Sequence, residues 1–151
     1  MSTNIYGKVR VRVLSPGSMP TRAHDTDAGA DLRSTAEHLI YPNEIKTVGT
    51  GVAMKIPEGF VGLVFSRSGM GKYGMTLANS VGVIDAEYRG EIKVMLQNSS
   101  LEPFKVAKGD RIAQIVLMPI ITPELIEFTG EEEAWNMSSR GTGGFGSSGT
   151  N

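Results

Sequence analysis

The chain has 151 residues, with 15 basic and 16 acidic side chains and a formal charge of −1. That length predicts a single main domain, and the near-neutral charge argues against a nucleic-acid partner, because duplex binding normally requires a basic surface. The lack of cysteine excludes a disulfide framework, a thiolate nucleophile and a cysteine-bound zinc ion.

Neither a secretory signal nor a membrane span is apparent in the sequence. The first ten residues have no apolar core, and no apolar run approaches the roughly 18 residues that cross a bilayer. We therefore expect a soluble cytoplasmic protein with no membrane partner and no nucleic-acid partner.

Short segments with strand patterns follow one another along the chain. Residues 8–13 alternate charged residues with valine, which is typical of a strand with one solvated face. Apolar or β-branched runs at 47–56 and 59–65, an alternating run at 91–96 and an apolar run at 111–118 add further strands. Turn signals separate these runs every eight to twelve residues or so. This spacing predicts an all-β fold, either an antiparallel sandwich or a barrel.

Helical patterns are weak, and we expect at most one or two short helices. Residues 66–73 could form a turn or two beside their glycines, and residues 130–135 could form a short acidic helix. The last 14 residues contain five glycines, four serines and two threonines, a composition that predicts a flexible arm. We accordingly divide the chain into a β domain, residues 1–137, and a C-terminal arm, residues 138–151.

The arm has two features that a plain flexible tail does not need. Arg140 lies just before the glycines, and Phe145 lies among them. An arginine, bare backbone amides and one aromatic ring could close over a phosphorylated ligand that carries a ring. From composition alone, a solvated tail and a closing arm both remain open.

Three polar segments are candidates for chemistry. Residues 25–31 hold three carboxylates, which indicate either a turn before a strand or a Mg²⁺ site completed by substrate phosphates. Residues 66–69 read Ser-Arg-Ser-Gly after an apolar strand, which fits either a helix start or an anion-binding turn. Gln114 is the one polar residue within 112–117, and its amide needs a partner, either a backbone group or a water on the substrate side.

A fourth segment, residues 85–90, lies between two apolar arms and predicts a β-hairpin with Gly90 at a positive φ. Asp85 directly follows the first arm, so its carboxylate is expected at the edge of the apolar interior. A carboxylate there can hold a water or a sugar hydroxyl, and the ring of Tyr88 could pack against a small ligand. An ordinary hairpin turn with solvated charges is the alternative.

Five segments occur in a fixed order: DAGADL at 27–32, SRSG at 66–69, GVIDAEYRG at 82–90, GDRIAQ at 109–114 and RGTGGFGSSG at 140–149. Together they closely resemble the five ordered motifs of the trimeric dUTPases (deoxyuridine triphosphate nucleotidohydrolases). The resemblance implies a jelly-roll-like β-barrel that assembles as a homotrimer, with each active site shared between subunits. It also implies Mg²⁺-dependent hydrolysis of dUTP to dUMP and pyrophosphate, which limits dUTP and supplies dUMP for thymidylate synthesis.

For the third motif, the resemblance implies that Asp85 is the catalytic residue, which orients the attacking water and contacts the deoxyribose 3′-hydroxyl. Tyr88 matches the ring that packs against the deoxyribose and leaves no room for a 2′-hydroxyl. The uracil edge would be read by Asn79 and by the backbone of Gly82, Val83 and Ile84.

On the phosphate side, the same resemblance implies roles for residues of the first, second and fourth motifs. Arg67, Ser68 and Gly69 match the phosphate-binding second motif, and Gln114 matches the fourth motif's glutamine near the phosphates. Asp31 matches the aspartate near the water shell of Mg²⁺, an ion held mainly by the triphosphate.

In the fifth motif, Arg140 would pair with the γ-phosphate and Phe145 would stack on the uracil. Gly144 and Gly146 would let the backbone of the arm approach the phosphates.

The second motif departs from the family pattern Pro-Arg-Ser-Gly-Leu-Ala. Ser66 replaces the proline, and Met70 and Gly71 replace the last two residues, which puts the rigidity of this loop in question. Two alternative functions remain open: a dCTP deaminase-like enzyme of the same fold, and a trimeric module that senses a nucleotide without turning it over.

Overall fold

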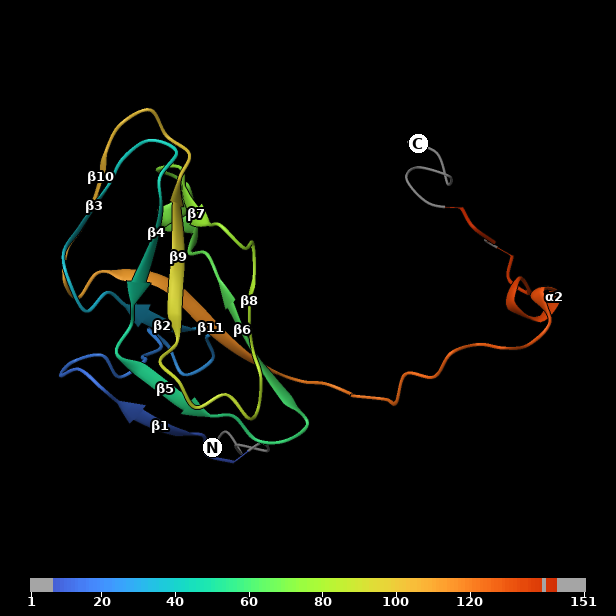
Figure 1. Cartoon of the computed structure of the whole chain (residues 1–151). Helices are drawn as coiled ribbons and strands as arrows, with labels where there is room; N and C mark the ends of the chain where they lie inside the picture. The colour runs from blue at the N-terminus through green and yellow to red at the C-terminus, as the bar shows by residue number, and fades with distance from the viewer. Residues whose placement is uncertain (1–6, 140, 144–151) are drawn as a thin grey trace. The chain divides into compact units, whose positions relative to one another are not determined.

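The computed structural model of the chain describes residues 7–139 and 141–143 (Figure 1). The chain divides into two compact units, 1–121 and 122–151. In the second unit the described residues form one short helix, α2 (Glu132–Trp135), where the sequence predicted an acidic helix. The proposed boundary between domain and arm after residue 137 stays a prediction.

The described part of the first unit is built of strands and one four-residue helix, which confirms the all-β expectation. The elements are β1 (Arg10–Val13), β2 (Ala30–Arg33), β3 (His38–Ile40), β4 (Ile45–Gly49), β5 (Val52–Lys55), β6 (Phe60–Phe65), α1 (Ser68–Gly71), β7 (Met75–Leu77), β8 (Gly82–Ile84), β9 (Lys93–Asn98), β10 (Phe104–Val106) and β11 (Arg111–Pro119). No helix among the described residues is long and apolar enough to cross a membrane.

All of the strand pairs are antiparallel, and two sheets carry the architecture. One sheet has the order β2-β11-β6-β8, and the other has the order β4-β9-β7. Two further strand pairs, β1-β5 and β10-β3, complete the unit. Figure 1 shows β4 and β9 running side by side, as their register requires.

One apolar cluster fills the interior and is supplied by both sheets. Leu32 of β2 and Ile112 of β11 are fully buried, as are Val48 of β4 and Met75 of β7. Along β9 the buried positions alternate with exposed ones, as expected for a strand with one face on the core. Burial of each large side chain contributes about 1.5–3 kcal/mol, so the first unit has its own core.

The run at 47–56, which its glycines interrupt, forms parts of two strands, because the chain turns after Gly49 and sends β4 to β9 and β5 to β1. One predicted element differs in the structure. The segment 81–96 is not a hydrogen-bonded β-hairpin, because β8 pairs with β6 while β9 pairs with β4 and β7. The connection therefore bridges the two sheets, and the separation of its arms leaves space between them.

Candidate functional site

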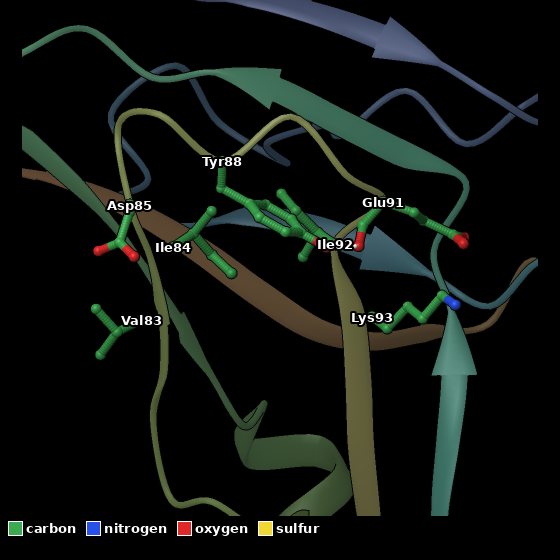
Figure 2. Close-up of a pocket in the computed structure, with 7 residues that line it drawn as sticks. All are labelled: Val83, Ile84, Asp85, Tyr88, Glu91, Ile92 and Lys93. Atoms are coloured by element: carbon green, nitrogen blue, oxygen red, sulfur yellow. Dashed lines mark hydrogen bonds between the residues drawn. The ribbon is translucent and has the colours of Figure 1, made fainter.

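A pocket of about 360 Å³ opens where the chain passes from β8 to β9 (Figure 2). We call it the loop pocket; its lining residues are Val83, Ile84, Asp85, Tyr88, Glu91, Ile92 and Lys93. In Figure 2, Val83 and Asp85 lie on one side, and Tyr88, Ile92 and Lys93 lie on the other.

A second pocket of about 110 Å³ shares part of this wall and continues between β8 and β9. We call it the side pocket. It shares Val83, Ile84 and Lys93 with the loop pocket. The residues that line only the side pocket are Val64, Leu77, Asn79, Gly82, Val94 and Met95. The described residues that the sequence assigned to the nucleoside therefore surround two adjoining cavities.

The ring of Tyr88 is held in place against the backbone of its own loop. Its hydroxyl donates a 2.9 Å hydrogen bond to the carbonyl oxygen of Glu91. The ring lies so close to Gly90 that a Cβ there would come 2.5 Å from the hydroxyl oxygen. The expectation of a positive φ at Gly90 is wrong; the position requires glycine because the tyrosine occupies the space of a side chain.

The base of the loop is anchored to the turn between β4 and β5. The Ile92 N–H donates to the carbonyl of Val52 over 2.7 Å, and the hydroxyl of Thr50 donates to the carbonyl of Ile92. The carboxylate of Glu91 accepts a 2.8 Å bond from the N–H of Gly51. These bonds fix the Glu91 carbonyl, and with it the tyrosine ring, before any ligand binds.

Asp85 lies at the mouth of the loop pocket, one residue beyond β8. Its backbone carbonyl accepts the N–H of Tyr88 at 3.1 Å, which closes the turn. Its side chain is exposed, and within the described residues its carboxylate has no hydrogen bond or ion pair. A carboxylate in that state can accept a proton from a bound water or from a hydroxyl group.

A second group of functional side chains forms around Asp31, and we call it the arginine cluster. Oδ1 of Asp31 lies 2.7 Å from Nε of Arg67, and Oδ2 lies 3.2 Å from Nη1 of Arg111. The carboxylate is only 14% exposed. Because two guanidinium groups share one carboxylate, the cluster keeps a net charge of +1 and the geometry to bind an anion.

Strand register explains why three separate motifs meet here. Asp31 of β2 lies opposite Gln114 of β11, which in turn lies opposite Phe65 at the end of β6. The amide of Gln114 donates a 3.0 Å hydrogen bond to the carbonyl of Ser66. The partner of this half-buried amide is thus a backbone group, and the bond ties the fourth motif to the second.

Gly29 provides the space for that amide, which gives a first prediction. A Cβ at residue 29 would come 2.5 Å from Oε1 and 3.2 Å from Cβ of Gln114. In Gly29→Ala the amide has to turn away and release the Ser66 carbonyl, at a cost of about 1–3 kcal/mol in unfolding free energy. Urea denaturation measures that loss.

Gly71→Ala is the matched control, since a Cβ there would meet nothing within 4 Å. We expect it to change the unfolding free energy by less than about 0.5 kcal/mol. Equal stability of the two variants would contradict the role of Gly29.

The acidic segment before β2 forms a turn. Asp27 is a partly exposed residue whose carboxylate accepts the backbone N–H of His24 at 2.9 Å, and this hydrogen bond lowers the pKa of the carboxyl group. Across the described residues, no group of three or more histidine, aspartate or glutamate side chains is arranged to hold a metal ion. Only Asp31 of this segment reaches the candidate site.

Within one chain, the loop pocket and the arginine cluster lie far apart. β8 pairs with β6 so that Gly82 faces Val64 and Ile84 faces Gly62, which places Asp85 level with residue 61. Arg67 lies six residues farther along the same direction, or roughly 20 Å at about 3.3 Å per residue. The structure therefore brings the predicted residues together as two groups.

The remaining predicted site residues fall into two sets. Ser68 and Gly69 are exposed in α1, directly after Arg67. Arg140, Gly144, Phe145 and Gly146 lie outside the described residues.

Sequence reasoning missed two side chains, Arg111 and Glu91. β11 shifts register between Arg111 and Ala113. The usual alternation of side chains between the two faces of a strand therefore does not reveal that Arg111 reaches Asp31. Glu91 carries no signal in the sequence, because its partner, the N–H of Gly51, comes from a turn forty residues earlier.

This chain is similar in sequence to known proteins over most of its length. A dUTPase family model matches residues 15–149. The chain is 47% identical over 134 residues to the deoxyuridine 5′-triphosphate nucleotidohydrolase of Mycolicibacterium gilvum, with 87% of each chain covered. It is 49% identical over 140 residues to the protein of that name from Mycobacterium bovis, with 90% of this chain and 91% of the relative covered.

Among solved structures, the dUTPase of Staphylococcus bacteriophage 80alpha with dUPNHPP is similar, with a TM-score of 0.85 and 35% identity over 95% of this chain and 99% of the other. A mutant dUTPase from phage phi11 of S. aureus, described as coordinating a structural Mg(II) ion, has a TM-score of 0.77 and 32% identity over 83% of this chain and 99% of the other. The expected jelly-roll-like fold is confirmed by these neighbours.

Proposed function

The chain belongs to the dUTPase family, and from that premise we propose that it hydrolyses dUTP to dUMP and pyrophosphate by attack of water on the α-phosphorus. The observation that carries the mechanism is the exposed carboxylate of Asp85 at the mouth of the loop pocket. The names of the relatives, which are dUTP nucleotidohydrolases, support the reaction.

In this proposal the nucleoside lies in the two adjoining pockets. The side pocket, at about 110 Å³, takes the uracil between Asn79 and the backbone of β8. The deoxyribose packs against the ring of Tyr88, whose position is fixed by its bond to Glu91. A fixed ring rejects a 2′-hydroxyl by overlap, and a narrow pocket rejects the 5-methyl group of thymine in the same way.

Asp85 acts as the general base. Its carboxylate orients a water, and it takes a proton as the water oxygen forms its bond to the α-phosphorus. The bond from the α-phosphorus to the oxygen that bridges to the β-phosphate breaks, and pyrophosphate leaves. Orientation is the larger part of the task, because phosphoryl transfer depends mainly on positioning and charge stabilisation.

The phosphates require the second group of residues. Arg67 supplies a cation, Ser68 and Gly69 supply donors at the start of α1, and Gln114 holds the loop that carries them. A triphosphate is much shorter than the roughly 20 Å between Asp85 and Arg67 along one chain. We therefore propose a homotrimer in which one subunit supplies the loop pocket and a neighbour supplies the arginine cluster.

The C-terminal arm completes the site in the same scheme. A third subunit would place Arg140 on the γ-phosphate and Phe145 on the uracil. Gly144 and Gly146 have no side chain, so the phosphates could lie close to the backbone there. This is the division of labour that the family resemblance implies.

Mg²⁺ fits the site only as an ion held mainly by the triphosphate. Both carboxylate oxygens of Asp31 already accept from arginines, so this residue would meet the ion through its water shell. When bound, Mg²⁺ neutralises charge that develops on the phosphates. We place the reaction in the cytoplasm, where it would limit dUTP and supply dUMP for thymidylate synthesis.

One assay tests the proposed function. Pyrophosphate release is measured with dUTP, dCTP, dTTP and UTP, each with and without Mg²⁺. We expect turnover of dUTP in the presence of Mg²⁺, with a kcat/KM at least about 100-fold higher than for the other nucleotides. Ammonia released from dCTP would indicate a deaminase, and tight binding of dUTP without turnover would indicate a sensing module.

Light scattering tests the assembly on the same sample. Three chains per particle are expected, and a monomer with full activity would contradict the shared site.

A further inference from the structure

Ser66 directly follows β6 and makes hydrogen bonds to two other strands. Its carbonyl accepts the amide of Gln114 in β11 at 3.0 Å. Its hydroxyl oxygen accepts a 3.1 Å hydrogen bond from the backbone N–H of Leu77, the last residue of β7. Because β6 and β11 belong to the four-stranded sheet and β7 to the three-stranded sheet, this one side chain joins the two sheets.

The bond to Leu77 closes the base of the segment 67–76, which carries the second motif. Inside that segment, α1 has four residues and no side-chain cap, so it has little stability of its own. Met70 is the buried residue of the helix and packs on the core. The position of Arg67 therefore depends on how the two ends of the segment are held.

We propose that Ser66 is a positioning residue for the phosphate-binding segment: its hydroxyl fixes the end of β6 on β7 and so keeps the guanidinium of Arg67 beside Asp31. The inference rests on the proposed function for its catalytic consequence. A proline at this position would restrain the backbone through its ring. Serine has no ring, and here the hydrogen bond to Leu77 supplies the restraint.

The Leu77 N–H belongs to a buried residue, with 5% of its surface exposed, so loss of its acceptor is costly. In Ser66→Ala this group stays unpaired or pulls β7 away from β6. Either change loosens the base of the segment and spreads the positions that Arg67 can take. The loop pocket lies at the other end of β8 and should not respond. Leu77 and Val64 line the side pocket, so uracil binding there should weaken less than binding of the phosphates that Arg67 contacts.

The test compares two ligands on the full chain. For Ser66→Ala we expect the Kd of a dUTP analogue with an imido bridge between the α- and β-phosphates to rise about tenfold. The Kd of dUMP, which lacks the β- and γ-phosphates but places its uracil in the side pocket beside Leu77, should rise by a clearly smaller factor. Ser66→Thr keeps the hydroxyl and should bind both ligands like the wild type. Ser99→Ala removes an exposed hydroxyl and serves as the control.

An equal loss of affinity for both ligands would mean that Ser66 has only a general structural role, and it would overturn the proposal. Unchanged affinity for both ligands would overturn it as well. If Ser66→Ala fails to fold, Ser66→Cys replaces it, since sulfur is a weaker acceptor and should give a smaller but selective loss.

Amide exchange at Leu77 tests the bond without reference to the reaction. Exchange should be about tenfold faster in Ser66→Ala than in the wild type, and unchanged exchange would overturn the proposal. An inactive wild type would instead contradict the proposed function.

Discussion

Asp85→Asn is expected to lower the kcat for dUTP by about 10²- to 10⁴-fold, the range for loss of a general base. The substitution keeps the size of the side chain but removes its ability to take a proton from water. Affinity for the imido analogue should change less than about threefold, because nucleoside and phosphates keep their other contacts. Stopped-flow measurement of pyrophosphate release gives the rate, and calorimetry gives the affinity.

The structure supplies a close control for this variant. Glu87 lies two residues farther along the same turn, is exposed, and within the described residues has no hydrogen bond or ion pair. Glu87→Gln makes the equivalent chemical change outside the pocket and should leave kcat unchanged. Near-normal turnover in Asp85→Asn would contradict the base assignment, and a fall in thermal stability would separate a folding defect from a chemical one.

Long strands were predictable because their side-chain alternation extends over enough residues. β9 and β11 have six and nine residues, and both were expected at nearly these positions. β3, β7 and β10 have three residues each, too few for alternation to be distinguished from a loop. Their pairing partners come from distant parts of the chain, so local sequence does not reveal them.

Only part of the candidate site's residues, and less of its geometry, could be predicted from the sequence. The family motifs indicated Asp85 and Tyr88, and the structure places both on the loop pocket. The hairpin prediction was wrong because local pattern cannot show that β8 and β9 join different sheets. The separation of β8 from β9 creates the two pockets. The volume of the site therefore comes from a strand pairing that local sequence does not reveal.

The geometry of the arginine cluster could not be predicted from local sequence either. Asp31 and Arg67 were expected near phosphates, yet their 2.7 Å ion pair and the contribution of Arg111 depend on the registers of three strands. Sequence likewise indicated that Ser66 departs from the family pattern. It could not indicate that the hydroxyl reaches Leu77, since that bond crosses between sheets.

Deletion of every residue after Met137 is expected to leave a folded trimer whose kcat/KM for dUTP falls about 100-fold or more. The first unit, residues 1–121, has its own core, so it should fold without the arm. A charge-assisted bond from Arg140 to the γ-phosphate contributes about 1.5–3 kcal/mol, and stacking of Phe145 on the base about 1–3 kcal/mol. Their combined loss of about 2.5–6 kcal/mol corresponds to a fold-change between about 70 and about 2 × 10⁴, a range that includes the expected fall.

The matched control is deletion of the last two residues alone, which keeps every arm residue assigned to the ligand and should leave kcat/KM unchanged. Light scattering establishes that both truncated proteins remain trimeric, so that a lower rate can be attributed to the arm. Unchanged kinetics in the longer deletion would contradict the arm's role. It would also mean that the arginine cluster and the loop pocket bind and turn over the triphosphate without it, in which case the +1 charge around Asp31 would have to be the main protein cation on the phosphates.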